Sequence, residues 1–343
     1  MSTAARLPEN PVVVITGGSS GVGLAVAQRL GRDGARLVLA ARGEQALADA
    51  AERCRALGAE VVAQVADVGE AADMEALMQR AVEAFGRIDA WINAAGTSLW
   101  GSFDTIPAEH HERLIRTNLL GVVHGTYAAL QHMRGRAGGG VVVNVASIAG
   151  CIPMPLAASY SASKFGVAGF TDALRDELSA TGIAVCGVYP SFIDTPEHQR
   201  SANFTGRTVR PVPPVLDPER VARAVVELLH RPRRSVALGL HHAAAVPYAV
   251  APDATGRAAA RAAARFFLQQ GERVPDSDGA LFAPLPLRAA VRGGWGVAER
   301  RKAGGVGMAV LGAVALAAGA VSWLFSAGRR RHGRERERLG TRP

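Results

Sequence analysis

The chain has 343 residues, of which 48% are hydrophobic and 20% charged, and its formal net charge is +9 at pH 7. This length suits one large α/β domain plus an appendage, and the composition excludes a chain that is mainly disordered. The positive charge would suggest nucleic acid if it followed one groove. The basic residues instead gather in the C-terminal third, and no basic groove with interleaved aromatic side chains precedes it. We therefore expect no nucleic-acid partner.

Cysteine usage and the N-terminus bear on the compartment. The three cysteines, Cys54, Cys151 and Cys186, are odd in number and far apart, with no metal-ligand spacing. This predicts inert thiols in a reducing compartment and no metal site. The first apolar run is only as long as a strand, so the N-terminus lacks the pattern of a signal peptide.

Short apolar runs rich in β-branched residues alternate with helical stretches from residue 11 to about residue 239. This alternation predicts an α/β fold, a Rossmann-type doubly wound parallel sheet of about seven strands with helices on both faces. The runs are almost continuously apolar, as expected of strands covered on both sides. They are 12–16, 37–41, 60–65, 88–93, 141–145, 183–189 and 236–240.

The pattern changes after Leu240, which predicts a division of the chain. Residues 8–240 form the expected nucleotide-binding catalytic domain, and residues 241–302, rich in Ala, Arg and Pro, form an irregular or helical extension. Residues 303–328 carry no charge and lie between basic triplets, with a basic tail at 329–343. Because about 20 apolar residues can cross a bilayer, we expect 303–328 to be a transmembrane helix, the alternative being a buried apolar helix. The expected localisation is a membrane-anchored protein with a cytoplasmic catalytic domain, and a soluble cytoplasmic protein is the alternative.

A glycine-rich turn follows the first predicted strand and leads into an Ala/Leu-rich helix. Glycines there let the backbone bend tightly, let a pyrophosphate approach the main chain and let the helix pack on the strand. The free N–H groups of the first helical turn then face the phosphate. A glycine turn alone is weak evidence, but its place between strand and helix predicts a dinucleotide site. The candidate cofactor-binding residues are Thr16, Gly17, Ser19, Ser20, Gly21, Val22 and Gly23.

The end of the second predicted strand indicates which dinucleotide binds. An acidic side chain about 20 residues beyond the glycines would bind the ribose 2′-hydroxyl of NAD. Here Ala41 occupies the position where the acidic residue is expected, and the next residue is the cation Arg42. A guanidinium suits a 2′-phosphate, which favours NADP over NAD, whereas the alternative is a solvated surface arginine.

Tyr160 and Lys164 provide the sharpest chemical signal. Residues at i and i+4 share a helix face, so the phenol and the ammonium can act on one site. A phenol with a pKa of about 10 is a poor acid–base group at neutral pH. A nearby cation stabilises the phenolate and lowers that pKa, so the pair predicts acid–base chemistry.

These pieces, taken in chain order, resemble the short-chain dehydrogenase/reductase family over about residues 10–240. The resemblance rests on the glycine turn, on Asn93, Ala94, Ala95 and Gly96 after the fourth strand, on Asn118, on Ser147 after the fifth strand, and on Tyr160 and Lys164. It implies that Tyr160 exchanges a proton with the substrate oxygen and that Lys164 holds the nicotinamide ribose. Ser147 would hydrogen-bond the substrate oxygen, and Asn118 would support a water relay to Lys164.

The same resemblance implies further cofactor contacts. Asp67 and Val68 match the pair beside the adenine, and Asn93 matches the residue that steadies the central sheet. Pro190, Ile193 and Thr195 match the segment that holds the carboxamide. Ser191 replaces the glycine usual in that segment, which leaves its local backbone conformation open.

The implied function is an NADP-dependent oxidoreductase that interconverts a carbonyl and an alcohol. Apolar residues near the expected cleft, namely Leu99, Trp100, Phe103, Ile152, Pro153, Met154 and Phe192, indicate an apolar substrate, although core packing explains such residues equally well. Homodimers or homotetramers are expected from the resemblance. The alternatives are a non-catalytic, membrane-tethered nucleotide-binding or regulatory protein and a sugar epimerase or dehydratase.

Overall fold

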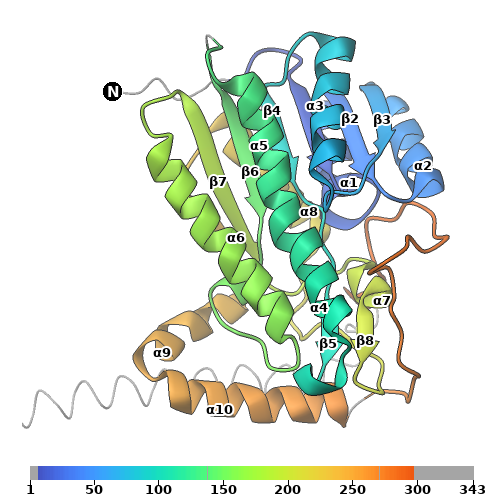
Figure 1. Cartoon of the computed structure of the whole chain (residues 1–343), viewed down its shortest axis with the longest axis vertical. Coiled ribbons are helices and arrows are strands. Elements are labelled where there is room, and N and C mark those ends of the chain that lie inside the picture. The colour runs from blue at the N-terminus through green and yellow to red at the C-terminus, as the bar shows by residue number, and fades with distance from the viewer. Residues whose placement is uncertain (1–6, 137, 270, 297–343) are drawn as a thin grey trace, which may run out of the picture.

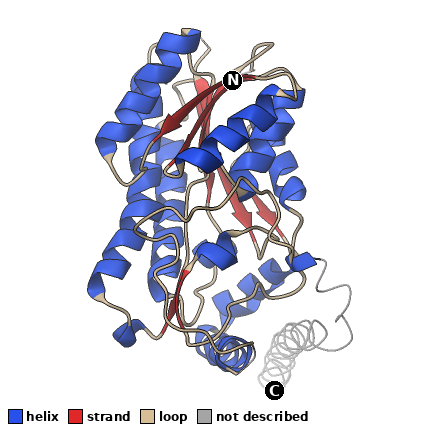
Figure 2. Ribbon diagram, turned by 90° about the vertical axis from the view of Figure 1, so that its right-hand side faces the viewer, coloured by secondary structure: helices blue, strands red, loops and turns tan. Residues whose placement is uncertain are grey.

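A twisted parallel sheet forms the centre of the molecule. The computed structural model describes residues 7–136, 138–269 and 271–296. Within them, seven strands pair in the order β3-β2-β1-β4-β6-β7-β9, every pair parallel. Figure 2 shows helices on both sides of this sheet. The predicted doubly wound fold is therefore confirmed.

The strands follow the predicted apolar runs, with ends that move by at most a few residues. They are β1 Val12–Thr16, β2 Arg36–Ala41, β3 Glu60–Val65, β4 Ala90–Asn93, β6 Gly140–Val145, β7 Ile183–Pro190 and β9 Ser235–Leu238. A separate two-stranded sheet joins β5 Leu99–Gly101 to β8 Ala202–Phe204. This small sheet was not predicted, because three residues are too few to show a period of two.

Two groups of helices cover the two faces of the sheet. On one face, α1, α2 and α8 pack together; on the other lie α3, α5 and α6 (Figure 1). The helices before the extension are α1 Gly21–Arg32, α2 Glu44–Arg55, α3 Ala71–Phe85, α4 Ala108–Ile115, α5 Gly121–Met133, α6 Ala158–Glu177, α7 Glu197–Arg200 and α8 Pro218–His230. A π-helical segment, Arg116–Leu120, joins α4 to α5.

Successive side chains of a strand pack alternately into two separate hydrophobic cores, one on each face of the sheet. Val13 and Ile15 of β1 pack in the cluster beneath α1 and α8, whereas Val14 packs in the cluster beneath α3 and α5. All three side chains are fully buried. This explains the uninterrupted apolar runs, because both faces of a parallel sheet are covered.

A buried polar network fixes the register at the centre of the sheet. Asn93 lies opposite Asn144 in the β4–β6 pairing, and its Nδ2 donates to Asn144 Oδ1 at 2.8 Å and to Thr126 Oγ1 at 3.0 Å. Trp91 Nε1 donates to Asn93 Oδ1 at 2.9 Å. Since each of these polar groups is buried, each depends on its partner. Asn93 thus steadies the sheet from inside and lies away from the cleft described below.

The extension after residue 240 has more helix than its composition suggests. It contains the 3₁₀ segment Leu240–Ala244, α9 Ala245–Val250, α10 Pro252–Ala263 and the π-helical segment Ala264–Leu268. Figure 1 shows α9 and α10 below the carboxyl end of the sheet. From α10 the chain turns back and runs past α7 towards α2 (Figure 1).

The predicted membrane-anchored localisation is corrected. Within residues 7–136, 138–269 and 271–296, no helix is long and apolar enough to cross a membrane. The longest of these helices, α6, has 20 residues but includes Lys164, Asp172 and Arg175, and charges of this kind oppose insertion into hydrocarbon. Residues 303–328, on which the prediction was based, lie outside the described residues, as does the basic tail.

Two helical glycines give opposite predictions for stability. A Cβ at Gly125 in α5 would lie 2.3 Å from Asn93 Oδ1, whereas a Cβ at Gly256 in α10 meets nothing within 4 Å. We expect Gly125→Ala to lower the free energy of unfolding by about 1–3 kcal/mol through overpacking. Gly256→Ala should raise it by about 0.5–1 kcal/mol through helix propensity. Urea denaturation measures both, and equal effects of the two substitutions would contradict this account.

Candidate functional site

A two-part cleft opens at the carboxyl ends of the central strands, where the strand order reverses between β1 and β4. Such a switch point is where open α/β sheets bind ligands. Gly17, Ser20, Ala95, Gly96, Thr97 and Glu197 border both parts. The first part is lined in addition by Gly21, Val22, Ala94, Ser98, Trp100, Val145, Ala146, Ser147, Ile148, Met154, Tyr160, Lys164, Pro190, Ser191, Phe192, Ile193, Thr195, Pro196 and His198.

The second part of the cleft lies beside the ends of β2 and β3. It is lined by residues of the glycine turn and of those strand ends, and also by residues of the C-terminal extension. Besides the shared residues, the lining consists of Ser19, Ala41, Arg42, Gly43, Ala46, Ala66, Asp67, Val68, Thr117, Arg200, Ala280, Pro284, Leu285 and Leu287.

The glycine turn has the shape that a phosphate group requires. A Cβ at Gly17 would lie 2.8 Å from Ala94 O, and a Cβ at Gly23 would lie 2.3 Å from Gly17 O, so both positions exclude any side chain. The backbone at Gly21 has a φ of +54°, where α1 begins. The cleft therefore meets a helix N-terminus with bare backbone around it. The N–H of Gly21 donates to Ala290 O, and those of the next residues of the first turn fit the pyrophosphate of a dinucleotide. Thr16 contributes indirectly, since its Oγ1 accepts from Ala94 N at 3.3 Å.

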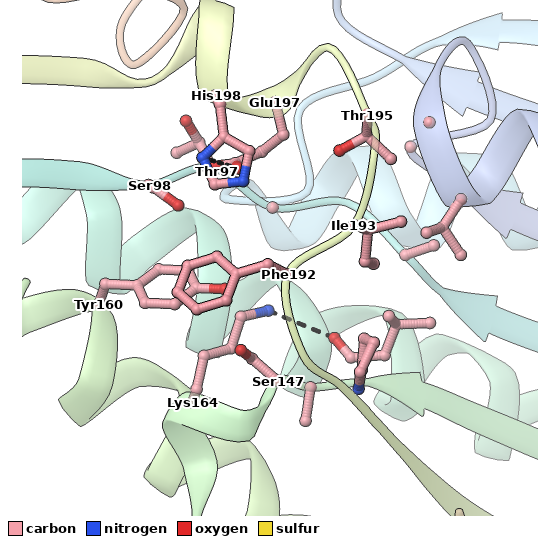
Figure 3. Close-up of a pocket in the computed structure, with 18 of the residues that line it drawn as sticks. Thr97, Ser98, Ser147, Tyr160, Lys164, Phe192, Ile193, Thr195, Glu197 and His198 are labelled. Atoms are coloured by element: carbon pink, nitrogen blue, oxygen red, sulfur yellow. Dashed lines mark hydrogen bonds and ion pairs between the residues drawn. The ribbon is translucent and has the colours of Figure 1, made fainter. Parts of the chain in front are cut away.

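Tyr160, Lys164 and Ser147 converge in the first part of the cleft. Tyr160 and Lys164 lie on α6, and Lys164 Nζ is 5.7 Å from the centre of the Tyr160 ring. The ammonium donates to Val145 O at 3.3 Å, next to the strand end that carries Ser147. Figure 3 shows Tyr160 between Ser98 on one side and Lys164 and Ser147 on the other. Three of the four predicted catalytic side chains, Ser147, Tyr160 and Lys164, thus line one cavity.

Burial dominates the electrostatics of this group. It raises the pKa of Tyr160; the Glu197 carboxylate raises it further, and hydrogen bonds with Ser147 and Ser98 lower it only in part. Burial also lowers the pKa of Lys164 to about 8, although Glu197 favours its charged form. In this chain without a cofactor, Tyr160 is therefore a protonated phenol at neutral pH. The spacing of Tyr160 and Lys164 predicted a lowered pKa for Tyr160, and the structure gives the opposite direction.

Asn118 occupies the π-helical segment between α4 and α5 and is fully buried. Its Oδ1 accepts from Thr97 N and its Nδ2 donates to Thr97 O, both at 2.9 Å. Nδ2 also donates to Ser163 Oγ at 3.2 Å. The side chain therefore holds the segment between β4 and β5, which borders the cleft. Asn118 and Lys164 both lie next to Gly96. A Cβ built on Gly96 would be 3.3 Å from Asn118 Oδ1 and 3.6 Å from Lys164 Nζ.

Arg42 lies in the second part of the cleft, but its guanidinium has partners that the sequence did not indicate. Its NH1 donates to Leu281 O at 2.9 Å and to Phe282 O at 3.2 Å, and its NH2 donates to Ala280 O. These carbonyls belong to the extension, almost 240 residues away in sequence. Arg42 is thus neither a solvated surface arginine nor an uncommitted anion ligand.

Asp67 and Val68 line the same part of the cleft. Burial raises the pKa of Asp67, but hydrogen bonds from Arg113 and from Gly69 N–H outweigh this effect and leave the pKa lowered. Asp67 is consequently a carboxylate at neutral pH, paired with Arg113.

The segment after β7 closes the first part of the cleft, and Ser191 fits there without strain. Its N–H donates to Leu238 O at 2.8 Å, and the positive-φ residues other than glycine among those described are only Asn10 and Leu156. Room for the Ser191 hydroxymethyl group comes from Gly239, where a Cβ would lie 2.0 Å from Ser191 Oγ. Ser191 therefore needs no left-handed backbone, and the absence of a side chain at Gly239 leaves the space that the Ser191 side chain fills.

Several lining residues were missed from the sequence. Glu197 and His198 follow Thr195 and Pro196 directly, so their position after a matched motif could have marked them. Burial lowers the pKa of His198, which makes it a neutral imidazole at pH 7. Of the apolar residues suggested for the substrate, Trp100, Met154 and Phe192 line the cleft. Leu99 is instead buried in a small core, and Phe103 is 63% exposed.

Comparison with known proteins agrees with this geometry. A family model described as short chain dehydrogenase matches residues 11–204. An uncharacterized oxidoreductase, YxnA, of Bacillus subtilis is 32% identical over 234 residues, which are 67% of this chain and 66% of that protein. A putative ketoacyl reductase of Streptomyces coelicolor is 39% identical over 194 residues, 55% of this chain and 72% of its own length.

Solved structures point the same way. An actinorhodin polyketide ketoreductase variant crystallised with NADPH superposes with a TM-score of 0.59 at 32% identity, covering 67% of this chain and 97% of its own. An alcohol dehydrogenase from the archaeon Thermococcus sibiricus, complexed with 5-hydroxy-NADP, also has a TM-score of 0.59, at 27% identity, covering 66% and 95%. The chain belongs to the short-chain dehydrogenase family and is an oxidoreductase of that class. The resemblance drawn from the sequence is therefore confirmed.

The contact between Gly239 and Ser191 predicts a non-additive pair of substitutions. Gly239→Ala combines a φ of +107° with a Cβ 2.0 Å from Ser191 Oγ, so it should cost about 2–5 kcal/mol of unfolding free energy. Ser191→Gly alone should cost no more than about 1 kcal/mol. The double variant should recover the part of the cost due to overlap, and urea denaturation of all four proteins measures this coupling. Strict additivity would contradict the proposed packing.

Proposed function

We propose that the chain is an NADP-dependent reductase of a keto group on an apolar substrate. The observation that carries this proposal is the convergence of Tyr160, Lys164 and Ser147 in one cleft, beside a bare glycine turn. A protonated phenol and a buried cation suit the reduction of a carbonyl better than a purely nucleotide-binding role. The names of similar proteins, a putative ketoacyl reductase and a polyketide ketoreductase with NADPH, support the direction and the cofactor.

The chain's own residues suggest how the cofactor would be held. The N–H groups of Val22 and Gly23 at the start of α1 would bind the pyrophosphate, since that of Gly21 donates to Ala290 O, and Asp67 and Val68 would flank the adenine. Ala94, Ala95 and Gly96 would provide bare backbone beneath the nicotinamide half, with Pro190, Ile193 and Thr195 holding its carboxamide. When bound, the nicotinamide supplies the hydride. Lys164, the cation in this part of the cleft, would bind the adjoining ribose.

The proton chemistry falls to Tyr160. Its phenol is protonated in the free chain and hydrogen-bonds with Ser147 and Ser98, so it can donate a proton to an oxygen placed between these hydroxyl groups. Ser147 would donate a hydrogen bond to the same oxygen as negative charge develops. Lys164 stabilises the phenoxide that remains, because its ammonium lies on the same helix face. Asn118, which stands beside Lys164, would hold the water that returns the proton.

An apolar substrate is proposed because aromatic and thioether side chains line the first part of the cleft beside Tyr160. Trp100, Phe192 and His198 gather there, with ring centres of Trp100 and Phe192 6.4 Å and 6.2 Å from that of His198. Met154 lines the same part of the cleft. Since His198 is neutral, this group of side chains carries no charge that would select an anionic substrate. Aromatic and thioether side chains favour an acyl or ring system around the keto group.

Replacing Tyr160 by Phe tests the proposed reaction. Tyr160→Phe removes the proton donor and keeps the ring, so NADPH oxidation with an apolar ketone should fall by about 10²–10⁴-fold. The measurement is the rate of loss of NADPH absorbance across a panel of apolar and small polar ketones. NADPH binding, titrated by fluorescence on the same variant, is the control for an intact site. Equal rates in the variant and the wild type would contradict the mechanism, and turnover of small polar ketones alone would contradict the substrate class.

The pKa of Lys164 predicts a pH dependence of cofactor binding. Burial lowers this pKa to about 8, below its unfolded value, so the ammonium is charged below that pH and neutral above it. The dissociation constant for NADPH should therefore rise as pH increases from 7 to 9.5. In Lys164→Met, binding should be weaker and nearly constant over this range. Fluorescence titration measures both proteins, and the same pH slope in both would contradict the role of Lys164.

A further inference from the structure

The C-terminal strap, defined as residues 278–293, crosses the mouth of the second part of the cleft. It lies outside the segment that matches the family, which ends at residue 204. In Figure 1 the chain turns back after α10, and the strap then passes α7 and reaches the neighbourhood of α2. Each end of the strap is fastened to the catalytic domain, and its middle faces the cleft.

The first end is held by a buried leucine and two polar contacts. Leu281 is fully buried against Leu99, Ile106 and Leu114. Asp278 Oδ1 lies 2.8 Å from His110 Nε2, and Ala280 N donates to Arg200 O at 2.7 Å. This end is therefore part of the folded core.

The second end reaches the glycine turn itself. Gly21 N donates to Ala290 O at 2.9 Å, and Ser20 and Ala290 form a parallel bridge. Beyond it, Asp194 Oδ1 accepts from Gly293 N at 3.1 Å, and Arg292 pairs with Asp217. The strap thus adds a short parallel strand contact at the point where the phosphate-binding helix begins.

Between these ends, the strap forms the outer wall of the cleft. Pro284, Leu285 and Leu287 line it together with Arg42 and Asp67. Leu285 and Leu287 are 36% and 43% exposed, although both border a cavity. Apolar side chains held in this way would be buried by a flat apolar group that entered the cleft.

We propose that the strap is the outer wall of the adenosine site, with Leu285 and Leu287 contacting bound adenosine. We further infer that it must open for the cofactor to enter or leave. This inference rests on the proposed function. The carbonyls of Ala280, Leu281 and Phe282 occupy both terminal nitrogens of Arg42. These hydrogen bonds use three of the five N–H groups of the guanidinium, and a 2′-phosphate that took the same three would displace the carbonyls. A dianion binds a guanidinium more strongly than neutral carbonyls do, so this exchange favours NADPH.

Leucine substitutions test the contact with adenosine. Leu285→Ser and Leu287→Ser, singly and together, should raise the dissociation constant for NADPH, by at least fivefold in the double variant. Leu268→Ser is the matched control, since Leu268 is 38% exposed, lies in the same extension and does not line the cleft. Binding is measured by fluorescence titration without a carbonyl substrate, and thermal unfolding checks each fold. A double variant that binds NADPH within twofold of wild type would overturn the proposal.

A reversible cross-link tests the opening. A Cβ at Gly43 would lie 3.4 Å from Pro284 Cβ, close to the separation of about 3.5–4.5 Å that disulfides span. Gly43 has a φ of −85°, which a cysteine adopts readily. In Gly43→Cys/Pro284→Cys, oxidation should slow both association and dissociation of NADPH by at least tenfold, and dithiothreitol should restore them. Stopped-flow fluorescence measures these rates, with wild type treated identically as the control.

The outcomes separate the two proposals. Equal rates in the oxidised and reduced double-cysteine protein, with the cross-link confirmed by mass, would overturn the opening step. Wild-type protein that binds no NADPH would overturn the proposed function, and the strap's role with it. Wild-type binding that is insensitive to both sets of substitutions would overturn the strap alone.

Discussion

The parallel alignment of β1, β4, β6 and β7 is the constraint on which the site depends. Because these strands run in one direction, their carboxyl ends deliver Gly17, Ala94, Ser147 and Pro190 to a single edge. The reversal of strand order between β1 and β4 separates the helices that follow and leaves the cleft between them. The register is held from inside, where Asn93 joins Asn144 and Thr126 beneath the edge. A shift of one residue would move each of these side chains to the other face.

Burial is the second determinant of the site, because it shifts the pKa values of ionisable side chains as well as stabilising the fold. Charge alone would predict an acidic Tyr160 beside Lys164, but desolvation raises the pKa of the phenol and lowers that of the ammonium. Glu197 strengthens the first effect and opposes the second. In the free chain the Tyr160 phenol is therefore protonated and can act as a proton donor. The same burial would strengthen an electrostatic contact that these groups make with a bound substrate.

Local patterns predicted the fold and most of the cleft. Continuous apolar runs marked the seven strands, and the glycine turn, Ser147, Tyr160 and Lys164 each follow a strand or share a helix face, so their convergence could be expected. The partners of Arg42 could not, because the strap lies almost 240 residues away and its carbonyls have no sequence signature. The β5–β8 pairing was hidden for a similar reason, as each strand has only three residues. The packing of Ser191 against Gly239 could not be predicted either, because these residues lie on separate segments that meet only in the folded chain.

The central claim, that this cleft directs hydride to a carbonyl carbon, is tested most directly by following the hydride. The purified chain would be supplied with NADPH deuterated at the nicotinamide C4 positions and with an apolar ketone, and the product analysed by mass spectrometry. The account predicts an alcohol carrying one deuterium on its carbinol carbon. Product without that deuterium, or oxidation of NADPH with no alcohol formed, would contradict it.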